Sequence, residues 1–143
     1  MAVLGSDISL DLHIVGDVEL DTIRGLVQEN GRLRPQLAGD LQRAIEDATK
    51  DILDQAGITE CSLTIDLGLA EGRVPGAPRE RIEARLDVEG DRSVLAAVDD
   101  AVGTPERARI ADAAEEHLDT RLDERDLTDV VGTTVIVTPV EFR

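Results

Sequence analysis

Few residues in this sequence are of the types that carry out covalent or acid–base chemistry. There are two histidines, His13 and His117, and one cysteine, Cys61. Neither histidine has a serine, a cysteine or a pair of carboxylates at the spacing of a catalytic motif. His13 falls on the polar side of an alternating stretch and Cys61 falls on the apolar side of another. We therefore interpret both histidines as facing solvent and Cys61 as a small hydrophobic residue rather than a nucleophile.

Acidic residues are abundant, but their spacing does not complete a metal site. Asp17, Glu19 and Asp21 follow the D-x-E-x-D pattern that opens a calcium-binding loop. The sixth position of such a loop needs glycine and here is Thr22, and the twelfth needs glutamate and here is Gln28. These acids are better explained as the start of a helix, where negative charge is stabilising.

Known phosphate-binding and hydrolytic motifs are absent from the sequence. It contains no G-x-x-x-x-G-K-[ST], G-x-G-x-x-G, H-E-x-x-H or G-x-S-x-G pattern. Nucleic-acid binding needs a basic stripe and often stacking aromatics, whereas here 15 basic residues face 31 acidic ones and aromatics make up 1% of the chain. We therefore expect no enzymatic activity, no cofactor, no metal and no nucleic-acid partner.

The net charge of −16 is large for 143 residues, and Lys50 is the only lysine. Such a surface repels itself at low salt, but at about 1 M salt the Debye length is only about 3 Å and the repulsion is screened. An acidic composition that is poor in lysine and retains arginine resembles proteins of extreme halophiles or their viruses. An acidic protein from a GC-rich genome is the alternative explanation.

The sequence also bears on where the protein works. A single cysteine excludes an internal disulfide. No apolar run reaches the roughly 18 residues of a membrane span, and the first residues lack the basic start and long apolar core of a signal peptide. We expect a cytoplasmic protein without membrane contact, or part of a virion assembled in the cytoplasm.

The rest of the chain is organised around one long amphipathic stretch, residues 34–56. Its apolar residues recur in steps of three and four from Leu37 to Ile52, which predicts a helix of about six turns. Pro35 suits the first turn, and Gly57 suits a left-handed stop after the last turn.

Three stretches alternate apolar and polar residues and are predicted to be strands, namely 7–15, 61–69 and 81–89. Their polar faces favour an antiparallel sheet. A β-branched stretch, 133–142, is predicted as the last strand, and its Pro139 indicates an edge or a bulge.

Shorter helices are predicted between these strands. One contains Leu20, Ile23 and Val27 and stops near the Asn30-Gly31 pair. Another covers 93–102, and a third begins at Pro105, with Thr104 as its cap. The predicted fold class is α+β. We expect a single domain, 1–143, with a mainly antiparallel sheet of about four strands covered by the long helix and the Pro105 helix.

Two regions are candidate interfaces. The stretch 70–79 holds two prolines and two glycines, must be a loop, and is flanked by arginines, which are enriched in protein contacts. The last strand offers apolar groups on both faces. The candidate interface residues are Arg73, Val74, Pro75, Arg79, Arg81, Val135, Val137, Val140 and Phe142.

Residues 8–56 resemble the start of head–tail completion proteins of tailed viruses. The resemblance lies in the order of a strand ending at Gly16, a small helix ELDTIRGLVQE, and the stretch RLRPQLAGDLQRAIEDATKDILDQA with its prolyl-leucyl break. After Gly57 the chain departs from that family, because no Thr-Gly-x-Leu turn follows the long helix. The resemblance implies a class only, a small non-enzymatic protein that works in a ring.

Three functional hypotheses follow from the sequence. The first is a structural assembly protein that forms a homo-oligomeric ring with other virion or assembly proteins as partners, such as a head–tail connector of a halophile virus. The second is a small protein- or ligand-binding module of a halophilic archaeon. The third is a small enzyme that depends on carboxylates or a metal.

Overall fold

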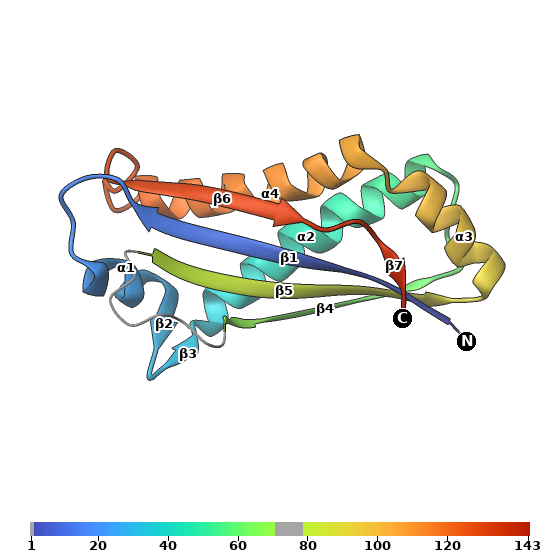
Figure 1. Ribbon diagram of the computed structural model, residues 1–143, viewed down its shortest axis with the longest axis horizontal. Coiled ribbons are helices and arrows are strands. Elements are labelled where there is room, and N and C mark those ends of the chain that lie inside the picture. The colour runs from blue at the N-terminus through green and yellow to red at the C-terminus, as the bar shows by residue number, and fades with distance from the viewer. Residues whose placement is uncertain (1, 71–78) are drawn as a thin grey trace.

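Strand β1 (Ala2–Ile14) lies at the centre of the sheet. It pairs antiparallel with β5 (Arg79–Gly90) on one side and with β6 (Val131–Val137) on the other. Strand β4 (Ser62–Leu69) pairs with β5, so the order is β4-β5-β1-β6, with β4 and β6 at the two margins (Figure 1). The two-residue β7 (Glu141–Phe142) continues the β6 margin beside the start of β1.

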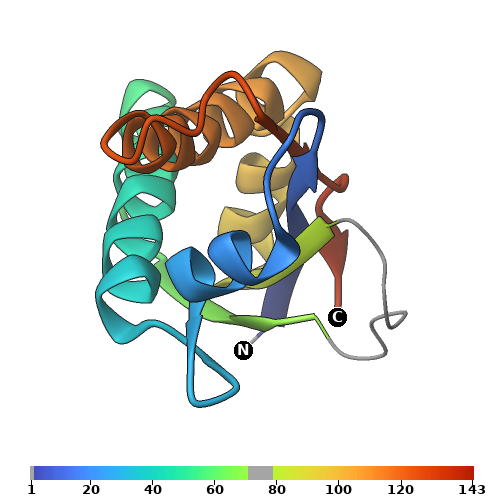
Figure 2. The same cartoon turned by 90° about the vertical axis from the view of Figure 1, so that its left-hand side faces the viewer.

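The computed structural model describes residues 2–70 and 79–143. Its helices are α1 (Leu20–Val27), α2 (Pro35–Gln55), α3 (Arg92–Ala101) and α4 (Thr104–Asp123), and a small hairpin is formed by β2 (Gln28–Glu29) and β3 (Arg32–Leu33). Seen from the end, α2 and α4 form one layer and the sheet forms the other (Figure 2). The main elements follow the order β1-α2-β4-β5-α4-β6, which with this strand order is the ferredoxin-like split βαβ arrangement.

The core lies between the sheet and the helix layer. Alternation along the strands places Leu10 of β1 and Ile82 of β5 on the helix-facing side, both fully buried. From the helices, Leu41 and Ile45 of α2 and Ile110 of α4 fill the same space. The core consists of aliphatic side chains, as a composition with 1% aromatic residues requires.

The α+β prediction is confirmed. The long helix spans Pro35–Gln55 and ends as expected at Gly57, whose φ is +73°. The Gly57 amide donates to the Asp54 carbonyl at 3.0 Å and the Ile58 amide donates to the Leu53 carbonyl at 2.9 Å, which is a Schellman C-cap.

Several boundaries differ from the sequence-based expectation. Strand β1 begins at Ala2 rather than at residue 7, because β5 continues to Gly90 and supplies a partner for the earlier residues. Thr104 is the first residue of α4 and not its cap. The cap is Gly103, whose amide donates to Oε1 of Glu106 at 3.2 Å.

The predicted last strand is split by a bulge around Pro139. Where β1 pairs with β6, the residue numbers of the two partners add to 145, as for Ile8 and Val137. Where β1 pairs with β7, they add to 146, as for Leu4 and Phe142. One extra residue therefore sits between the two short strands. The expectation of an edge or a bulge at Pro139 is confirmed.

Candidate functional site

The face of the sheet opposite the helices carries charged side chains that are joined in cross-strand pairs. Asp11 and Arg81 lie directly opposite each other on β1 and β5. Arg81 donates to the Asp11 carboxylate through Nε at 2.8 Å and through Nη2 at 3.2 Å. This hydrogen bond raises the pKa of the Arg81 guanidinium, a group that is charged at any ordinary pH.

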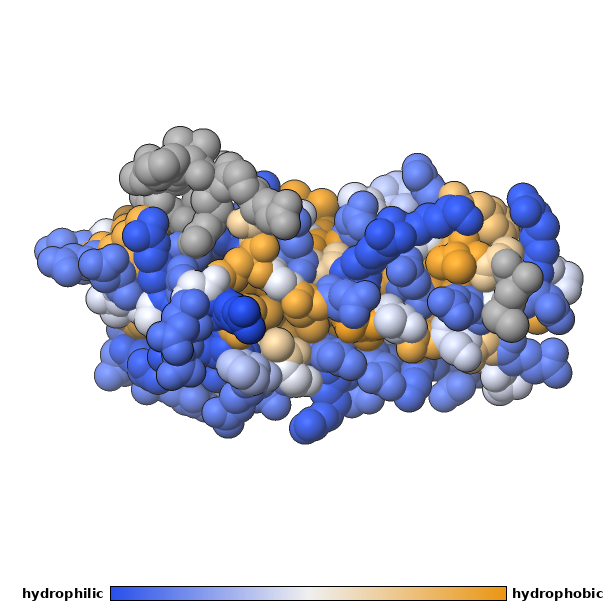
Figure 3. Space-filling view, turned by 90° about the horizontal axis from the view of Figure 1, so that it is seen from below, coloured by the Kyte–Doolittle hydropathy of each residue, from blue (hydrophilic) through white to orange (hydrophobic). Residues whose placement is uncertain are grey.

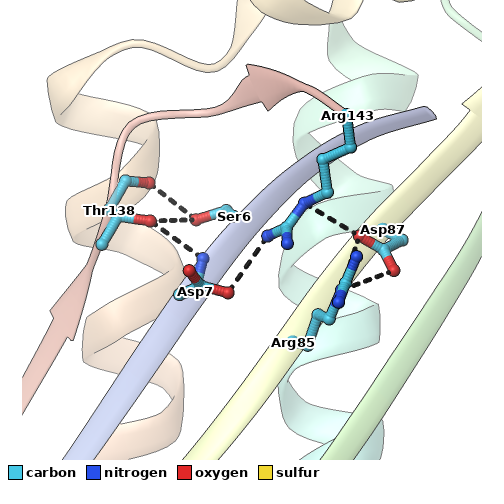
Figure 4. A network of polar contacts seen from close by, with 6 residues as sticks. All are labelled: Ser6, Asp7, Arg85, Asp87, Thr138 and Arg143. Carbon is cyan, nitrogen blue, oxygen red and sulfur yellow. Dashed lines mark hydrogen bonds and ion pairs between the residues drawn. The ribbon is translucent and has the colours of Figure 1, made fainter.

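A second network of two arginines and two aspartates lies further along the same face (Figure 4). Arg143 crosses over β1, with Nη2 3.0 Å from Asp7 Oδ1 and Nε 3.4 Å from Asp87 Oδ1. Asp87 also binds Nε of Arg85 at 3.1 Å. The backbone beneath is Gly5, where a Cβ would lie 1.8 Å from Nε of Arg143. Glycine is therefore what allows Arg143 to lie flat across the strand.

Thr138 fastens the bulge between β6 and β7 to β1. Its Oγ1 accepts a hydrogen bond from the Asp7 amide at 2.8 Å, and its carbonyl accepts one from Oγ of Ser6 at 2.6 Å (Figure 4). The Thr138 amide donates to the Asp7 carbonyl at 2.9 Å. The polar atoms freed by the bulge are thus satisfied locally.

An open hollow of about 600 Å³ lies on this face where β1, β5 and β4 meet. Its floor includes Gly68, above which there is open space. The charged side chains that line it include Asp66, Glu83 and Arg85, and Arg85 is bound to Asp87. The hollow is an open, mildly acidic surface. Arg85, the one arginine among the described residues that line it, could bind an anion only by breaking its ion pair with Asp87.

The structure does not bring the histidines and the cysteine together. His13 lies near one end of the sheet, against Gly132 of β6, while Cys61 lies near the other end, beside Gly90 of β5. Cys61 is partly buried, and burial raises the pKa of its thiol. The interpretation of Cys61 as a small hydrophobic residue is consistent with this placement.

His117 is only partly exposed, with 27% of its side-chain surface accessible, because α4 packs on α2. Its Nε2 is buried 3.9 Å from Oδ2 of Asp40, an oxygen that already accepts a hydrogen bond from Nη2 of Arg121 at 2.7 Å. The 3.9 Å separation is too long for a hydrogen bond. His117 therefore belongs to the seam between the helices.

The candidate interface residues from the sequence fall into several environments. Arg73, Val74 and Pro75 lie outside the described residues, and Arg79 is the first residue of β5. Arg81 is bound to Asp11 as described. The three valines Val135, Val137 and Val140 are partly buried against the core. Phe142 keeps 40% of its surface exposed, and the guanidinium of Arg92 lies 4.8 Å from the centre of its ring.

Sequence reasoning missed the margin formed by β4. The side chains of Leu63, Leu67 and Leu69 face the helix side but are only partly buried, because α2 covers β4 incompletely. Seen from below, apolar surface runs along the middle of the molecule between polar residues (Figure 3). The signal in the sequence was the low charge of this strand, in which Asp66 is the one charged residue of eight.

Within residues 2–70 and 79–143 no group of three or more His, Cys, Asp or Glu side chains is placed to hold a metal ion. Among the helices of the same described part, none has both the length and the apolar character needed to cross a bilayer.

Comparisons with known proteins identify no family. No family model and no curated protein match the sequence. Solved structures with partial similarity to this chain include a hydantoinase/carbamoylase-family amidase from Burkholderia vietnamiensis, with a TM-score of 0.35 and 11% identity over 99% of this chain and 28% of that one. A putative aminohydrolase from methicillin-resistant Staphylococcus aureus has a TM-score of 0.33 and 12% identity, and the match covers 96% of this chain and 29% of that one.

A de novo designed protein, Foldit4, is similar over nearly the whole length of both chains, with a TM-score of 0.30, 10% identity, and coverage of 95% of this chain and 96% of that one. The chain spans less than a third of the length of the two bacterial enzymes. At TM-scores below 0.5 these likenesses carry no argument about function.

Proposed function

We propose that this protein is a non-enzymatic structural protein that assembles with copies of itself. The observation that carries the proposal is the low charge of both margins of the sheet. Charged residues make up 32% of the chain, yet β4 contains one charged residue in eight and β6 contains none in seven. Exposed sheet edges are usually protected by charges, prolines or coverage, because they otherwise pair with other chains.

The charged groups of the open face support the same proposal. Arg81 binds Asp11 and Arg143 binds Asp87 across strands, while Arg85 binds Asp87 within β5. Groups engaged in this way rigidify the sheet. A rigid sheet whose two margins carry one charged residue between them is suited to building a larger assembly.

The more specific role is a ring at the head–tail junction of a tailed virus of a halophile. It is supported by the resemblance of residues 8–56 to head–tail completion proteins and by the acidic, lysine-poor composition. In such a ring the work of the protein would be geometric, because identical contacts that run head to tail close when the rotation per subunit allows.

The proposal is tested by measuring the mass of the purified protein by light scattering in about 2 M NaCl, at tens of micromolar. We expect a discrete multiple of the 15.4 kDa chain. The same measurement at about 0.1 M NaCl should give smaller species, because the −16 charge then opposes association. A 15.4 kDa species at high salt throughout this concentration range would overturn the proposal.

A further inference from the structure

We propose that β4 of one copy pairs antiparallel with β6 of the next copy, so that the sheet continues from subunit to subunit. This inference rests on the proposed self-assembly and specifies its contact. Both strands are margins of the same sheet, at opposite sides of the molecule (Figure 1). They have similar lengths, eight residues for β4 and seven for β6.

The strand directions fit this pairing. All neighbours in β4-β5-β1-β6 are antiparallel, so the two margins run in opposite directions. When β4 of one copy is placed beside β6 of another with both helix layers on the same side, the two strands are antiparallel. The alternation of the sheet then continues without a break.

Two hydrogen bonds indicate which residues of β4 and β6 direct their backbone N–H and C=O groups away from the sheet. The Ala70 amide donates to the Arg81 carbonyl. The N–H and C=O groups of the even-numbered residues of β4 therefore bond to β5, and those of the odd-numbered residues point outward. The Thr138 amide donates to the Asp7 carbonyl, so the odd-numbered residues of β6 point outward in the same way. Leu67 in β4 and Val135 in β6 are therefore matched, because each directs its backbone N–H and C=O groups outward from its margin.

The side chains also match across the proposed contact. On the helix side, Leu67 of β4 would lie opposite Val135 of β6, with Leu63 and Val137 further along the same contact, and all four are partly buried in the single chain. Pairing would complete the burial of these apolar groups, which is favourable. On the open side, Asp66 of β4 would meet a strand that has no charged residue.

Charge identifies the occupant of these margins as a second copy. Two chains of net charge −16 repel one another least where their contact surfaces are nearly neutral, as both margins are. A basic partner protein would instead find almost no acid to bind on β4 or β6. Contact of β4 with β4 would leave the β6 margin open, whereas contact of β4 with β6 uses both.

The test uses two matched variants, Leu67→Pro and Val135→Pro. Each removes one outward N–H from one margin while keeping the hydrogen bonds within the sheet, a position at which edge strands tolerate proline. Leu67→Ala and Val135→Ala are the controls, since they remove similar side-chain contacts and keep the N–H. Circular dichroism establishes that each variant is folded, and light scattering in about 2 M NaCl gives its mass.

We expect each proline variant alone to have the mass of one chain and each alanine variant to remain assembled. An equimolar mixture of the two proline variants should give a complex of one copy of each, twice 15.4 kDa, and nothing larger. The reason is that the intact β6 of the Leu67→Pro chain can still pair with the intact β4 of the Val135→Pro chain.

Other outcomes separate the alternatives. If only Leu67→Pro prevents assembly, β4 pairs with β4; if only Val135→Pro does, β6 pairs with β6; and if neither does, a partner surface elsewhere is used. Each of these overturns the β4–β6 contact while the proposed self-assembly stands. A wild-type protein that has the mass of one chain overturns both.

Hydrogen exchange of the wild-type protein provides a second measurement that needs no folded variant. In the assembled protein, the amides of Leu67 and Val135 should exchange at least tenfold more slowly than in protein dissociated by dilution in the same high salt, where the fold is kept. The amide of Ile136 bonds to β1 within the chain and is the internal reference. Unchanged exchange of Leu67 and Val135 upon assembly would overturn the inference.

Discussion

Nε of Arg24 donates a hydrogen bond to Oε1 of Glu80 at 2.9 Å, and the Glu80 side chain has no exposed surface. Glu80 lies on the helix side of β5, and Arg24 lies on α1. Nε2 of Gln28 approaches the second carboxylate oxygen at 3.4 Å. A buried carboxylate is costly unless its charge is paired, so this contact fixes α1 to the end of the sheet.

The Arg24–Glu80 pair gives the first prediction. Arg24→Met should lower the free energy of unfolding by about 2 kcal/mol, because it removes a charge-assisted hydrogen bond to a buried carboxylate. Arg109→Met is the control, since Arg109 pairs with Asp51 at 2.7 Å where both side chains are largely exposed, and it should cost about 0–1 kcal/mol. Denaturant titrations in about 2 M NaCl measure both values. Equal losses for the two variants would contradict the role assigned to burial.

The second prediction compares Gly39, which lies within α2, with Gly57, which lies at the C-terminal cap of α2. Gly57 has a φ of +73°, and Gly39 lies in the helix with open space at its Cβ position. Gly57→Ala should lower the free energy of unfolding by about 1 kcal/mol, because alanine is strained in the left-handed region. Gly39→Ala should raise it by up to about 1 kcal/mol, because alanine is the better helix former. Thermal unfolding of both variants checks the signs, and a stabilising Gly57→Ala would refute the Schellman assignment.

Much of the fold could be predicted from local patterns. The long helix and the strands beginning near Ser62 and Arg81 repeat with clear periods, and the Pro139 bulge followed from the chemistry of proline. The Asn30-Gly31 pair was interpreted as a helix stop, whereas it is the turn of the β2–β3 hairpin, with φ of 54° and 76°. Asn-Gly is a strong hairpin signal, but here the flanking strands are only two residues long.

The candidate site was less predictable because it depends on which strands become neighbours. The pairing of Asp11 with Arg81 requires the antiparallel register of β1 and β5, and no local pattern specifies that register. The incomplete cover of β4 likewise depends on where α2 lies over the sheet. His117 was assigned to solvent from its local sequence, and the packing of α4 on α2 places it between the helices.

The third prediction concerns the pH dependence of Cys61. Burial raises the pKa of its thiol in the folded protein. The rate of alkylation by iodoacetamide should therefore rise at higher pH in the folded protein than in the urea-unfolded protein, where a thiol titrates near about 8.5. Identical midpoints in the two states would contradict the burial effect.

The raised pKa of the Cys61 thiol also makes the free energy of unfolding depend on pH. Because the folded state holds the thiol proton more tightly, the stabilising contribution is present below the unfolded pKa and is lost as the pH rises through the folded pKa. The free energy of unfolding of the wild-type protein should fall over that interval. Cys61→Ser is the matched control and should lack this component of the pH dependence.

The last prediction is that the fold depends on salt. Along α4, Asp112, Glu115, Asp119 and Asp123 line an acidic hollow of about 650 Å³, and like charges three or four residues apart destabilise a helix. The Debye length falls from about 10 Å at 0.1 M salt to about 3 Å at 1 M. Helical circular dichroism should therefore decrease as NaCl is lowered from molar concentration to about 0.1 M.

Charge-reduced variants make this prediction specific. Asp112→Asn and Glu116→Gln each remove one charge from the hollow, and both side chains are exposed. Combining them should lower the NaCl concentration at which half of the helical signal is recovered. Thr128→Ser, at the rim of the same hollow, changes no charge and should leave that midpoint unchanged. NaCl is used because strongly excluded salts such as sulfate stabilise any fold. A constant spectrum from about 0.1 M to molar NaCl would refute the halophilic interpretation of the −16 charge.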